Sequence, residues 1–326
     1  GLSLLPFAFF SNSSMFFSVI IPTYNRLPIL QKCLQGLAQQ QIAKPVEQYE
    51  VIVIDDGSND GTWDWLTDYQ QQMPQLRCFR QQNAGPAAAR NLGLDQAKGD
   101  TIVFIDSDLV VTDSFLQAHK NALTGGFAKL GHERLFTYGA VINTCDFENP
   151  TAEPYKVTDF SAAYFATGNV AIPRHLLDKV GHFDTRFKQY GWEDLELGVR
   201  LKKIGVKLIK CPEAVGYHWN PAFSLERLPA LIEREQQRAK TGVLFYQKHP
   251  TWEVRFMIQM TPVHRALWGV LSWGGYWNEQ RLSGLLQWLI ERGRSQLALE
   301  IARIFLNWYH VQAVRDAYRQ QHPQTA

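Results

Sequence analysis

The chain has 326 residues, of which 45% are apolar, so it is longer than one typical domain and can bury a sizeable core. Its formal net charge of +2 offers no general attraction for nucleic acid, and we predict no nucleic-acid partner. The cysteines are too dispersed for a metal knuckle or a disulfide framework, which favours a reducing, cytoplasmic compartment; they are Cys33, Cys78, Cys145 and Cys211.

The start of the chain, residues 1–14, is interpreted as an expression remnant or a disordered start. Gly1–Phe10 is apolar, but it lacks the positively charged region of a signal peptide and is too short to span a bilayer. The folded part is therefore expected to begin at Met15.

Short β-branched runs alternate with helical patterns through about residue 210. Because such alternation is typical of βαβ units, it predicts an α/β fold with a Rossmann-like, mostly parallel sheet flanked by helices. Strands are predicted at Ser18–Ile21, Glu50–Ile54, Leu76–Arg80 and Thr101–Ile105, and helices at Leu27–Leu37, Gly61–Tyr69 and Pro86–Gln96.

The pattern is looser from residue 113 to residue 224. We predict a helix from Asp113, a strand over Phe136–Ile142, a polar loop over Asn143–Thr158 and a strand over Val206–Ile209 that ends before Pro212. Residues 15–224 are predicted to form the first domain.

Residues 225–326 are predicted to form a C-terminal helical region. This region holds 13 Lys and Arg against 8 Asp and Glu and most of the tryptophans. Two interpretations remain open: the helices pack on the first domain, or residues 251–326 make peripheral contact with a membrane, since basic residues among Trp, Leu and Phe suit the lipid headgroup boundary. No stretch has the roughly 20 uninterrupted apolar residues of a transmembrane helix.

Acidic residues follow two of the buried strands. Asp55 and Asp56 end the second strand, and Asp106-Ser107-Asp108 ends the fourth. In an α/β protein, carboxylates at the carboxyl ends of parallel strands gather at one edge of the sheet, where ligands bind. Carboxylate oxygens suit Mg²⁺ or Mn²⁺, so Asp106 and Asp108 are predicted metal ligands, with His218 as a possible third.

A third acidic pair, Glu193-Asp194, begins a helical pattern. Acidic residues are common in a first helical turn because they complement the helix dipole. The same dipole would keep a carboxylate ionised, as a general base requires, so both interpretations stay open. The preceding Gly191-Trp192 could present an aromatic platform to a sugar ring.

Six motifs, in order, resemble the inverting family 2 glycosyltransferases over about Ser18–His218. They are Ser18-Val19-Ile20-Ile21-Pro22-Thr23-Tyr24-Asn25-Arg26, Asp55-Asp56-Gly57-Ser58-Asn59-Asp60-Gly61-Thr62, Asn83-Ala84-Gly85-Pro86-Ala87-Ala88-Ala89-Arg90-Asn91, Asp106-Ser107-Asp108, Gly168-Asn169 and Trp192-Glu193-Asp194. The segment Phe183–Leu201 also resembles the base region of the β-galactosyltransferases. The resemblance implies a glycosyltransferase A fold, a catalytic domain over 15–224 that binds a nucleotide sugar, and hexosyl transfer.

The resemblance also implies roles for individual residues. The nucleotide, expected to be UDP, would be lined by Pro22, Thr23, Tyr24, Arg26 and Ser107. Asp56 would accept a hydrogen bond from the uracil imide, and Arg90 would lie near the base or diphosphate. Asp106 would face the ribose and the metal, and Asp108 would bind the metal.

On the acceptor side, Asp194 would be the base, and Glu193 would hold the acceptor or orient its loop. Gly168, Asn169 and Trp192 would contact the sugar or acceptor, which would be a saccharide or a lipid-linked hydroxyl. Such an enzyme could take part in polysaccharide biosynthesis.

The processive members of the family carry Gln-x-x-Arg-Trp after the base, whereas this chain has Glu235-Gln236-Gln237-Arg238-Ala239, which predicts transfer of one or a few sugars. Two enzyme classes share parts of the pattern. A nucleotidyltransferase should have a Gly-rich phosphate loop after the first strand, and a dinucleotide oxidoreductase needs Gly-x-Gly-x-x-Gly there; Pro22-Thr23-Tyr24-Asn25 is neither. A non-catalytic protein that binds nucleotide sugars or saccharides on the same scaffold stays open as an alternative.

Overall fold

The computed structural model describes residues 15–42, 49–159, 161, 163–188 and 191–321. The interpretation of residues 1–14 lies outside these ranges. The chain divides into two compact units: an α/β unit that runs to Lys188 and resumes over Glu193–Asn220, and a helical unit made of the short segment ending at Trp192 together with the chain from Pro221.

The α/β unit is built on one eight-stranded sheet in the order β3-β2-β1-β4-β7-β6-β8-β5. Its first four strands are parallel, as predicted, whereas β4–β7, β6–β7 and β5–β8 are antiparallel, so the sheet as a whole is mixed. The strands are β1 (Phe17–Thr23), β2 (Tyr49–Asp55), β3 (Leu76–Arg80), β4 (Thr101–Ile105), β5 (Leu109–Val111), β6 (Leu135–Thr144), β7 (Asn169–Pro173) and β8 (Lys207–Trp219).

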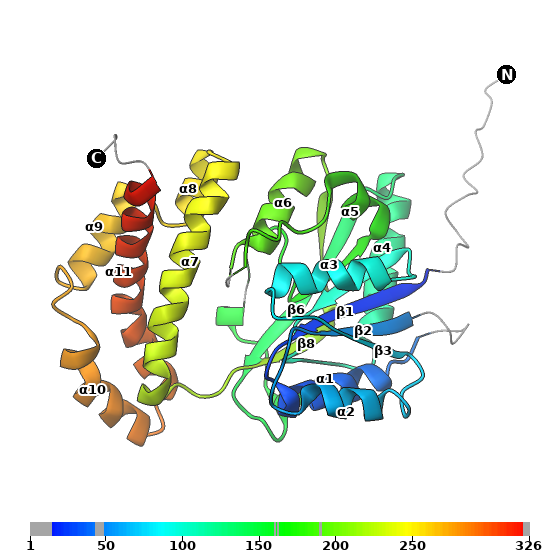
Figure 1. Ribbon diagram of the computed structural model, residues 1–326, viewed down its shortest axis with the longest axis horizontal. Coiled ribbons are helices and arrows are strands. Elements are labelled where there is room, and N and C mark those ends of the chain that lie inside the picture. Colours follow the sequence, from blue (N-terminus) through cyan, green and yellow to red (C-terminus); the bar gives the residue numbers. More distant parts are fainter. Residues whose placement is uncertain (1–14, 43–48, 160, 162, 189–190, 322–326) are drawn as a thin grey trace. The chain divides into compact units, whose positions relative to one another are not determined.

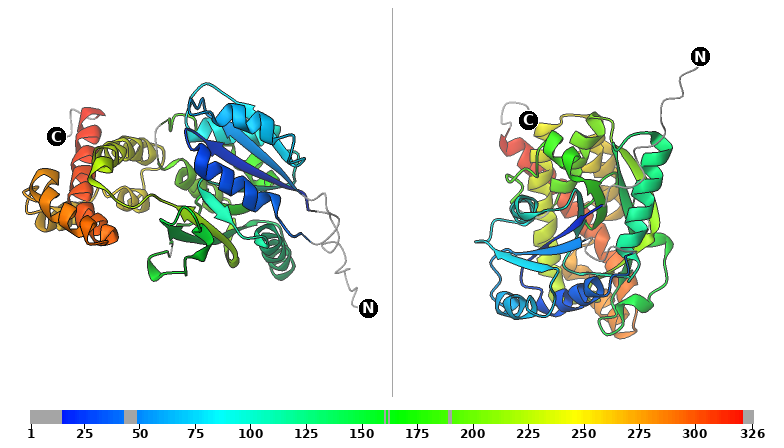
Figure 2. Two further views of the ribbon diagram at one scale, coloured as in Figure 1. Left: turned by 90° about the horizontal axis from the view of Figure 1, so that it is seen from below. Right: turned by 90° about the vertical axis from the view of Figure 1, so that its right-hand side faces the viewer.

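Helices cover both faces of this sheet (Figures 1 and 2). Strand residues alternate between two cores, since Val19 and Ile21 of β1 belong to one and Ile20 belongs to the other. The first core includes residues of α1 (Leu27–Ala38) and α4 (Phe115–Leu130), and α2 (Thr62–Tyr69) contributes Leu66 to it; the second includes residues of α3 (Pro86–Gln96), α5 (Arg174–Val180) and α6 (Glu193–Lys203).

Strand β8 is longer than the sequence predicts, because it continues through Pro212. Cys211 is paired with Gly139 of β6 and Val215 with Ala140, so three residues of β8 bulge out between adjacent β6 residues. A bulge tolerates proline, which lacks the N–H that a regular ladder would need. Beyond the bulge His218 lies within the strand, paired with Leu109 of β5 and Asn143 of β6.

The bulge is held by Asn169, at the start of β7. Its side-chain nitrogen donates to the carbonyls of Ala140 and Ala214, both at 2.9 Å, and its oxygen lies 2.9 Å from His119 Nε2. The other ring nitrogen of His119 lies 2.8 Å from Thr137 Oγ1. Burial lowers the pKa of His119 to about 4, so its ring is neutral at pH 7.

The helical unit consists of α7 (Leu228–Lys248), α8 (Trp252–Met257), α9 (Pro262–Leu271), α10 (Glu279–Glu291) and α11 (Ser295–Gln321). Leu282, Leu286 and Leu289 of α10 share a core with α11 residues Ala302 and Phe305. Three helices start at side-chain caps, because the oxygens of Thr251, Thr261 and Asn278 accept bonds from backbone N–H groups of the first turn. Among the described residues, no helix combines the length and apolar composition needed to cross a bilayer.

Short 3₁₀ turns complete the described secondary structure. They are η1 (Pro150–Ala152), η2 (Val157–Asp159) and η3 (Leu225–Arg227). The predicted polar loop over Asn143–Thr158 therefore begins inside β6, which ends at Thr144, and contains η1 and the start of η2.

Replacing Asn169 with Ala should destabilise the α/β unit by about 2–4 kcal/mol, because two buried carbonyls and a buried imidazole lose their partner. Urea unfolding followed by tryptophan fluorescence measures the change. The control is Asn121→Ala on the exposed side of α4, where we expect less than about 0.5 kcal/mol. Equal effects of the two substitutions would contradict a structural role for Asn169.

Candidate active site

Two carboxylates and a histidine converge at the carboxyl end of β4. Asp106 and Asp108 follow this strand directly, and β5 places Leu109 opposite His218 of β8. The backbone N–H of Trp219 donates to the carbonyl of Asp108 at 2.9 Å, which fixes the two segments together. One ligand atom from each of Asp106, Asp108 and His218 lies within 4.8 Å of the others. The structure thus brings together the three residues that the sequence predicts as metal ligands.

The surroundings of Asp108 fit a divalent cation. Its side chain is buried, Oδ1 lies 3.2 Å from His218 Nε2, and Oδ2 contacts the guanidinium of Arg26. Among the described residues, Oδ1 accepts no regular hydrogen bond. A buried carboxylate oxygen without a hydrogen bond lowers the stability of the fold unless a positive charge lies nearby. Two carboxylates and an imidazole are a set of ligands that divalent metals accept.

Arg90, on α3, links this cluster to the acidic pair of α6. Its Nη2 lies 3.1 Å from Asp106 Oδ1 and its Nη1 lies 3.0 Å from Glu193 Oε1. Although burial alone would lower the pKa of Arg90, the charges of Glu193, Asp106 and Asp194 raise it overall. Arg90 therefore holds a permanent buried positive charge between carboxylates. That it lies near the base or diphosphate of the nucleotide stays a prediction.

Asp194, at the start of α6, is held by backbone N–H groups and has a raised pKa. Its Oδ1 accepts from the N–H of Leu195 at 2.7 Å, and its Oδ2 lies 3.4 Å from the N–H of Thr167. Burial, and next the negative charge of Glu193, raise the pKa of Asp194 to about 7, against the opposing effects of Arg90 and these backbone bonds. A carboxylate with this pKa binds a proton more readily than an ordinary aspartate and is still largely ionised just above neutral pH.

Glu193 is in a different condition from its neighbour. It is buried, its Oε1 is paired with Arg90, and its Oε2 accepts no hydrogen bond within the described part of the chain. This unsatisfied oxygen is free to accept a bond from a ligand hydroxyl. The two adjacent carboxylates thus have different partners: Glu193 is paired with Arg90, whereas Asp194 accepts hydrogen bonds from backbone N–H groups.

Asp56, at the end of β2, is already held by the loop before α3. Its Oδ1 accepts from Gln81 Nε2 and from the N–H of Ala84, both at 2.8 Å, and its Oδ2 accepts from the N–H of Gly85 at 2.9 Å. A carboxylate has about four acceptor positions, so Oδ2 retains one. The neighbouring Asp55 is not available, since it is buried and paired with Arg80 at 3.2 Å.

The loop after β1 presents the remaining predicted nucleotide contacts. Thr23 is buried with a hydroxyl that has no hydrogen-bond partner among the described residues, whereas Tyr24 is exposed. Asn25 adopts a left-handed conformation (φ 52°), accepts from the N–H of Asn59 at 2.8 Å and donates its own N–H to Ser58 Oγ at 2.9 Å. These bonds fix the loop to the end of β2. Pro22 is half-buried, Arg26 is exposed and Ser107 is buried.

Two of the three predicted acceptor contacts lie differently from the expectation. Asn169 is fully buried and its amide is used within the sheet, so it cannot contact a saccharide in this structure. Trp192 is also buried; it belongs to the helical unit, where its indole donates to the carbonyl of Arg238 at 2.7 Å and the Arg238 guanidinium lies 4.6 Å from its ring. A sugar platform is therefore not exposed at Trp192. Gly168 lies against the metal cluster, since a Cβ there would be 3.4 Å from Asp106 Oδ2.

Sequence reasoning missed Tyr138. This residue of β6 is buried, and burial, with the charges of Asp194 and Asp106, raises its pKa. It is paired with Val170 of β7 and Lys210 of β8, and Lys210 Nζ lies 4.3 Å from its ring. A prediction of strand β7 and of its pairing with β6 would have found it, because that pairing places Tyr138 beside the acidic cluster.

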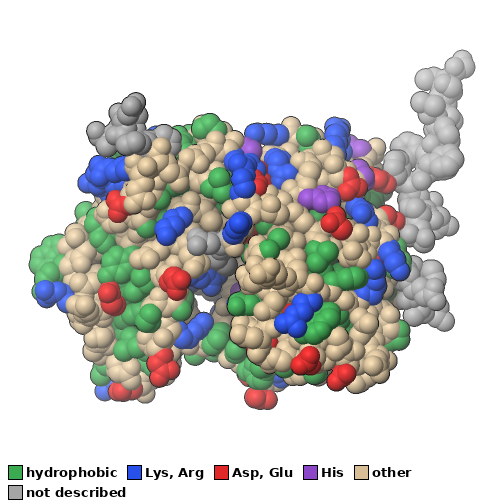
Figure 3. Space-filling model, in the orientation of Figure 1, with side chains coloured by type: hydrophobic (Ala, Val, Ile, Leu, Met, Phe, Trp, Pro, Cys, Tyr) green, Lys and Arg blue, Asp and Glu red, His purple; other side chains and the backbone are tan. Residues whose placement is uncertain are grey.

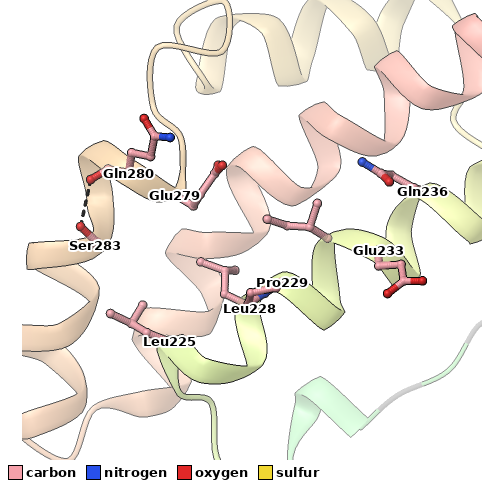
Figure 4. A pocket seen from close by; sticks show the side chains of 9 residues that line it. Leu225, Leu228, Pro229, Glu233, Gln236, Glu279, Gln280 and Ser283 are labelled. Carbon is pink, nitrogen blue, oxygen red and sulfur yellow. Dashed lines mark hydrogen bonds between the residues drawn. The ribbon is translucent and has the colours of Figure 1, made fainter.

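A separate pocket of about 530 Å³ lies in the helical unit and contains none of the predicted site residues. The first residues of α7 and α10 line it, with apolar Leu225, Leu228 and Pro229 opposite polar Gln280 and Ser283 (Figure 4). The chemistry of the acidic cluster therefore does not depend on this pocket.

Comparison with known proteins places these features in a family. The model of glycosyl transferase family 2 matches residues 18–183, and a model described as the N-terminal domain of galactosyltransferase matches residues 150–233. The chain is 30% identical over 247 residues to a chondroitin synthase of Pasteurella multocida, covering 64% of this chain and 25% of that protein. The chain thus spans about a quarter of the length of this relative.

Two solved structures share the fold. A mannosyltransferase of Pyrobaculum calidifontis, in complex with GDP-Man and Mn²⁺, has a TM-score of 0.54 at 20% identity and aligns over 95% of this chain and 87% of its own. A structure of GalNAc-T7 with UDP, GalNAc and Mn²⁺ has a TM-score of 0.51 at 19% identity, over 64% of this chain and 43% of its own. Together with the match over more than half of the sequence, the glycosyltransferase A fold and the ordered motifs show that this chain belongs to glycosyl transferase family 2.

Proposed function

We propose that the protein transfers a hexosyl group, with inversion, from a nucleotide diphosphate sugar to a hydroxyl of a saccharide or lipid-linked acceptor. UDP is the proposed nucleotide. The observation that supports this most is the continuity of the site: a cluster of three potential metal ligands is joined through Arg90 to an acidic pair whose second member has a raised pKa. Binding a sugar does not require a carboxylate whose pKa is raised to near 7, whereas proton transfer at neutral pH does.

Asp106, Asp108 and His218 would hold the divalent cation, Mn²⁺ or Mg²⁺. When bound, such a cation supplies Lewis-acid neutralisation of the negative charge that the diphosphate leaving group gains. Arg26, which contacts Asp108, is positioned to exchange that carboxylate for a phosphate oxygen when the donor arrives.

Asp194 is the proposed general base. A sugar hydroxyl is far too weak an acid to ionise at neutral pH, so it attacks the anomeric carbon only if a base removes its proton as the new bond forms. One displacement of this kind inverts the anomeric centre and needs no covalent enzyme intermediate. Glu193, with one oxygen on Arg90 and the other unsatisfied, is proposed to hold a second acceptor hydroxyl and so orient the acceptor.

The nucleotide is proposed to lie along the ends of β1 and β2. Oδ2 of Asp56 retains one acceptor position for the imide N–H of uracil, and the unsatisfied hydroxyl of Thr23 can bond the nucleotide. Tyr24 can stack on the base or pack against the ribose, since its side chain is exposed. Pro22 and Ser107 are proposed to line this space, and Gly168 to face the donor sugar beside Asp106.

The sequence and the state of the cysteines support proposals for how many sugars are transferred and in which compartment. The absence of Gln-x-x-Arg-Trp supports non-processive transfer, such as one step in assembling a polysaccharide. All four cysteines are free thiols, which supports work in the reducing cytoplasm. We propose peripheral contact with the inner face of the membrane through residues 251–326 as the route to a lipid-linked acceptor.

Asp108→Asn should weaken Mn²⁺-dependent binding of UDP at least about tenfold, because the cluster loses its buried anionic ligand and the diphosphate repels the remaining carboxylates. Calorimetric titration of UDP, with Mn²⁺ and with EDTA, measures this. Asp68→Asn, at an exposed position of α2, is the matched control and should bind UDP normally. UDP affinity that is unchanged in EDTA would rule out the metal role of the cluster.

Asp194→Asn should fold and bind the donor but lose transfer by about 10² to 10⁴, the usual contribution of a general base, while Glu193→Gln should lose less. The wild-type rate should fall about tenfold per pH unit below the Asp194 pKa of about 7. Release of UDP with a validated acceptor measures both. Near-normal turnover of the Asp194 variant would assign the proton transfer to another group.

The same substitution should raise the thermal midpoint at pH 8. The folded state raises the pKa of Asp194 from its ordinary value of 3.8, so ionisation opposes folding. This stability cost is absent below about pH 4, grows as the pH rises toward about 7 and is fully present above it. The difference between Asp194→Asn and wild type should therefore vanish at pH 4; a variant that melts lower than wild type at pH 8 would contradict the assigned environment.

A further inference from the structure

We propose that α9 and the loop after it form a docking face for an anionic phospholipid membrane. This proposal narrows the suggested peripheral contact from residues 251–326 to one short amphipathic element, Pro262–Trp277. It stands independently of the transfer reaction, because it concerns only residues of the helical unit.

Helix α9 presents an apolar stripe to solvent. None of its ten residues is buried. Val263, Leu267, Val270 and Leu271 are exposed, with 78% of Val270 accessible, and their spacing places them on one side of the helix. The opposite side holds Trp268, whose indole donates to Gln259 Oε1 at 2.6 Å, and Gly269, which lies against Trp308 of α11. The helix is thus attached by one side and uncovered on the other.

An exposed aromatic cluster continues this stripe past the end of the helix. The rings of Trp273 and Tyr276 meet at 5.2 Å between centroids, and those of Tyr276 and Trp277 at 5.3 Å. All three rings are exposed, and 68% of Trp273 is accessible. Tryptophan and tyrosine with one apolar and one wet side are the residues that lie at lipid headgroups. Apolar side chains are visible at the surface of the helical unit in Figure 3, on its left-hand side.

The sequence of this face contains basic but no acidic residues. From Val254 to Asn278 the sequence contains no Asp or Glu. Arg265 lies on the side of α9 opposite the stripe and near Arg315 of α11, so it is not part of this face. Arg281 lies over the ring of Tyr276 at 4.0 Å. Cations beside an apolar stripe complement a surface of anionic headgroups.

A membrane fits this face better than a protein partner does. A helix of ten residues cannot span a bilayer, but an apolar stripe of this length can lie in the interface. A fluid anionic surface supplies negative charge wherever Arg281 lies, whereas a protein partner would need an acidic group fixed at one place to pair with it.

The experiment is sedimentation of the full chain with vesicles of mixed phosphatidylcholine and phosphatidylglycerol, and with vesicles of phosphatidylcholine alone, without donor or metal. We expect binding to the anionic vesicles at low salt and weaker binding at high salt. Val270→Asp should weaken it at least about tenfold, since a buried valine contributes that much. Arg281→Gln should weaken it about fivefold.

Val157→Asp is the matched control, because this valine of the α/β unit is 91% exposed and should tolerate the same change without loss of vesicle binding. Circular dichroism and the thermal midpoint establish that each variant is folded. No sedimentation with anionic vesicles, or equal effects of Val270→Asp and Val157→Asp, would overturn the proposal. A dimer in light scattering that Val270→Asp converts to a monomer, without vesicle binding, would assign the face to a second copy instead. Since no sugar transfer is measured, neither outcome depends on the proposed reaction.

Discussion

The buried charge of Arg90 is the interaction on which the rest of the site depends. Asp108 and Glu193 are buried and Asp106 and Asp194 are partly buried, and carboxylates gathered in this way repel one another. One guanidinium bridges the two pairs, with one nitrogen on Asp106 and another on Glu193. Its fork geometry allows both contacts at once, which a lysine could not reproduce. The neutralisation is incomplete: the remaining negative charge favours a cation beside Asp108, and on the other side burial, followed by the charge of Glu193, raises the pKa of Asp194.

The sheet makes this arrangement possible by bringing distant segments to one edge. The parallel strands β1, β2 and β4 end together, so the nucleotide residues and the first carboxylates follow from a regular α/β pattern. Strand β7, which runs antiparallel to β4, and strands β6 and β8 then carry Gly168, Tyr138 and His218 to the same edge. Segments from many parts of the α/β unit thus contribute to a single site, while the helical unit retains its own core and its own exposed face.

The first half of the α/β unit could be predicted because local signals agree there. Hydrophobic runs of strand length, helical spacing and turn residues all favour the same elements from Ser18 to Ile105. The second half could not, because β5 and β7 are short and β8 contains a proline that normally ends a strand. The grouping of Asp106, Asp108 and His218 was predictable from residue type and motif order. The burial of Asn169 and Trp192 was not, since a motif records which residue is present and not which side of the backbone it occupies.

The bulge in β8 has a consequence for the direction of the side chains beyond it. Three extra residues between Cys211 and Val215 are an odd number, so the alternation of side chains between the two sheet faces is reversed beyond the bulge. His218 therefore belongs to the face that Cys211 occupies, and a uniform ladder would have turned it to the opposite one. The face on which His218 lies is thus set by a bulge between Cys211 and Val215, and not by any motif that contains the histidine.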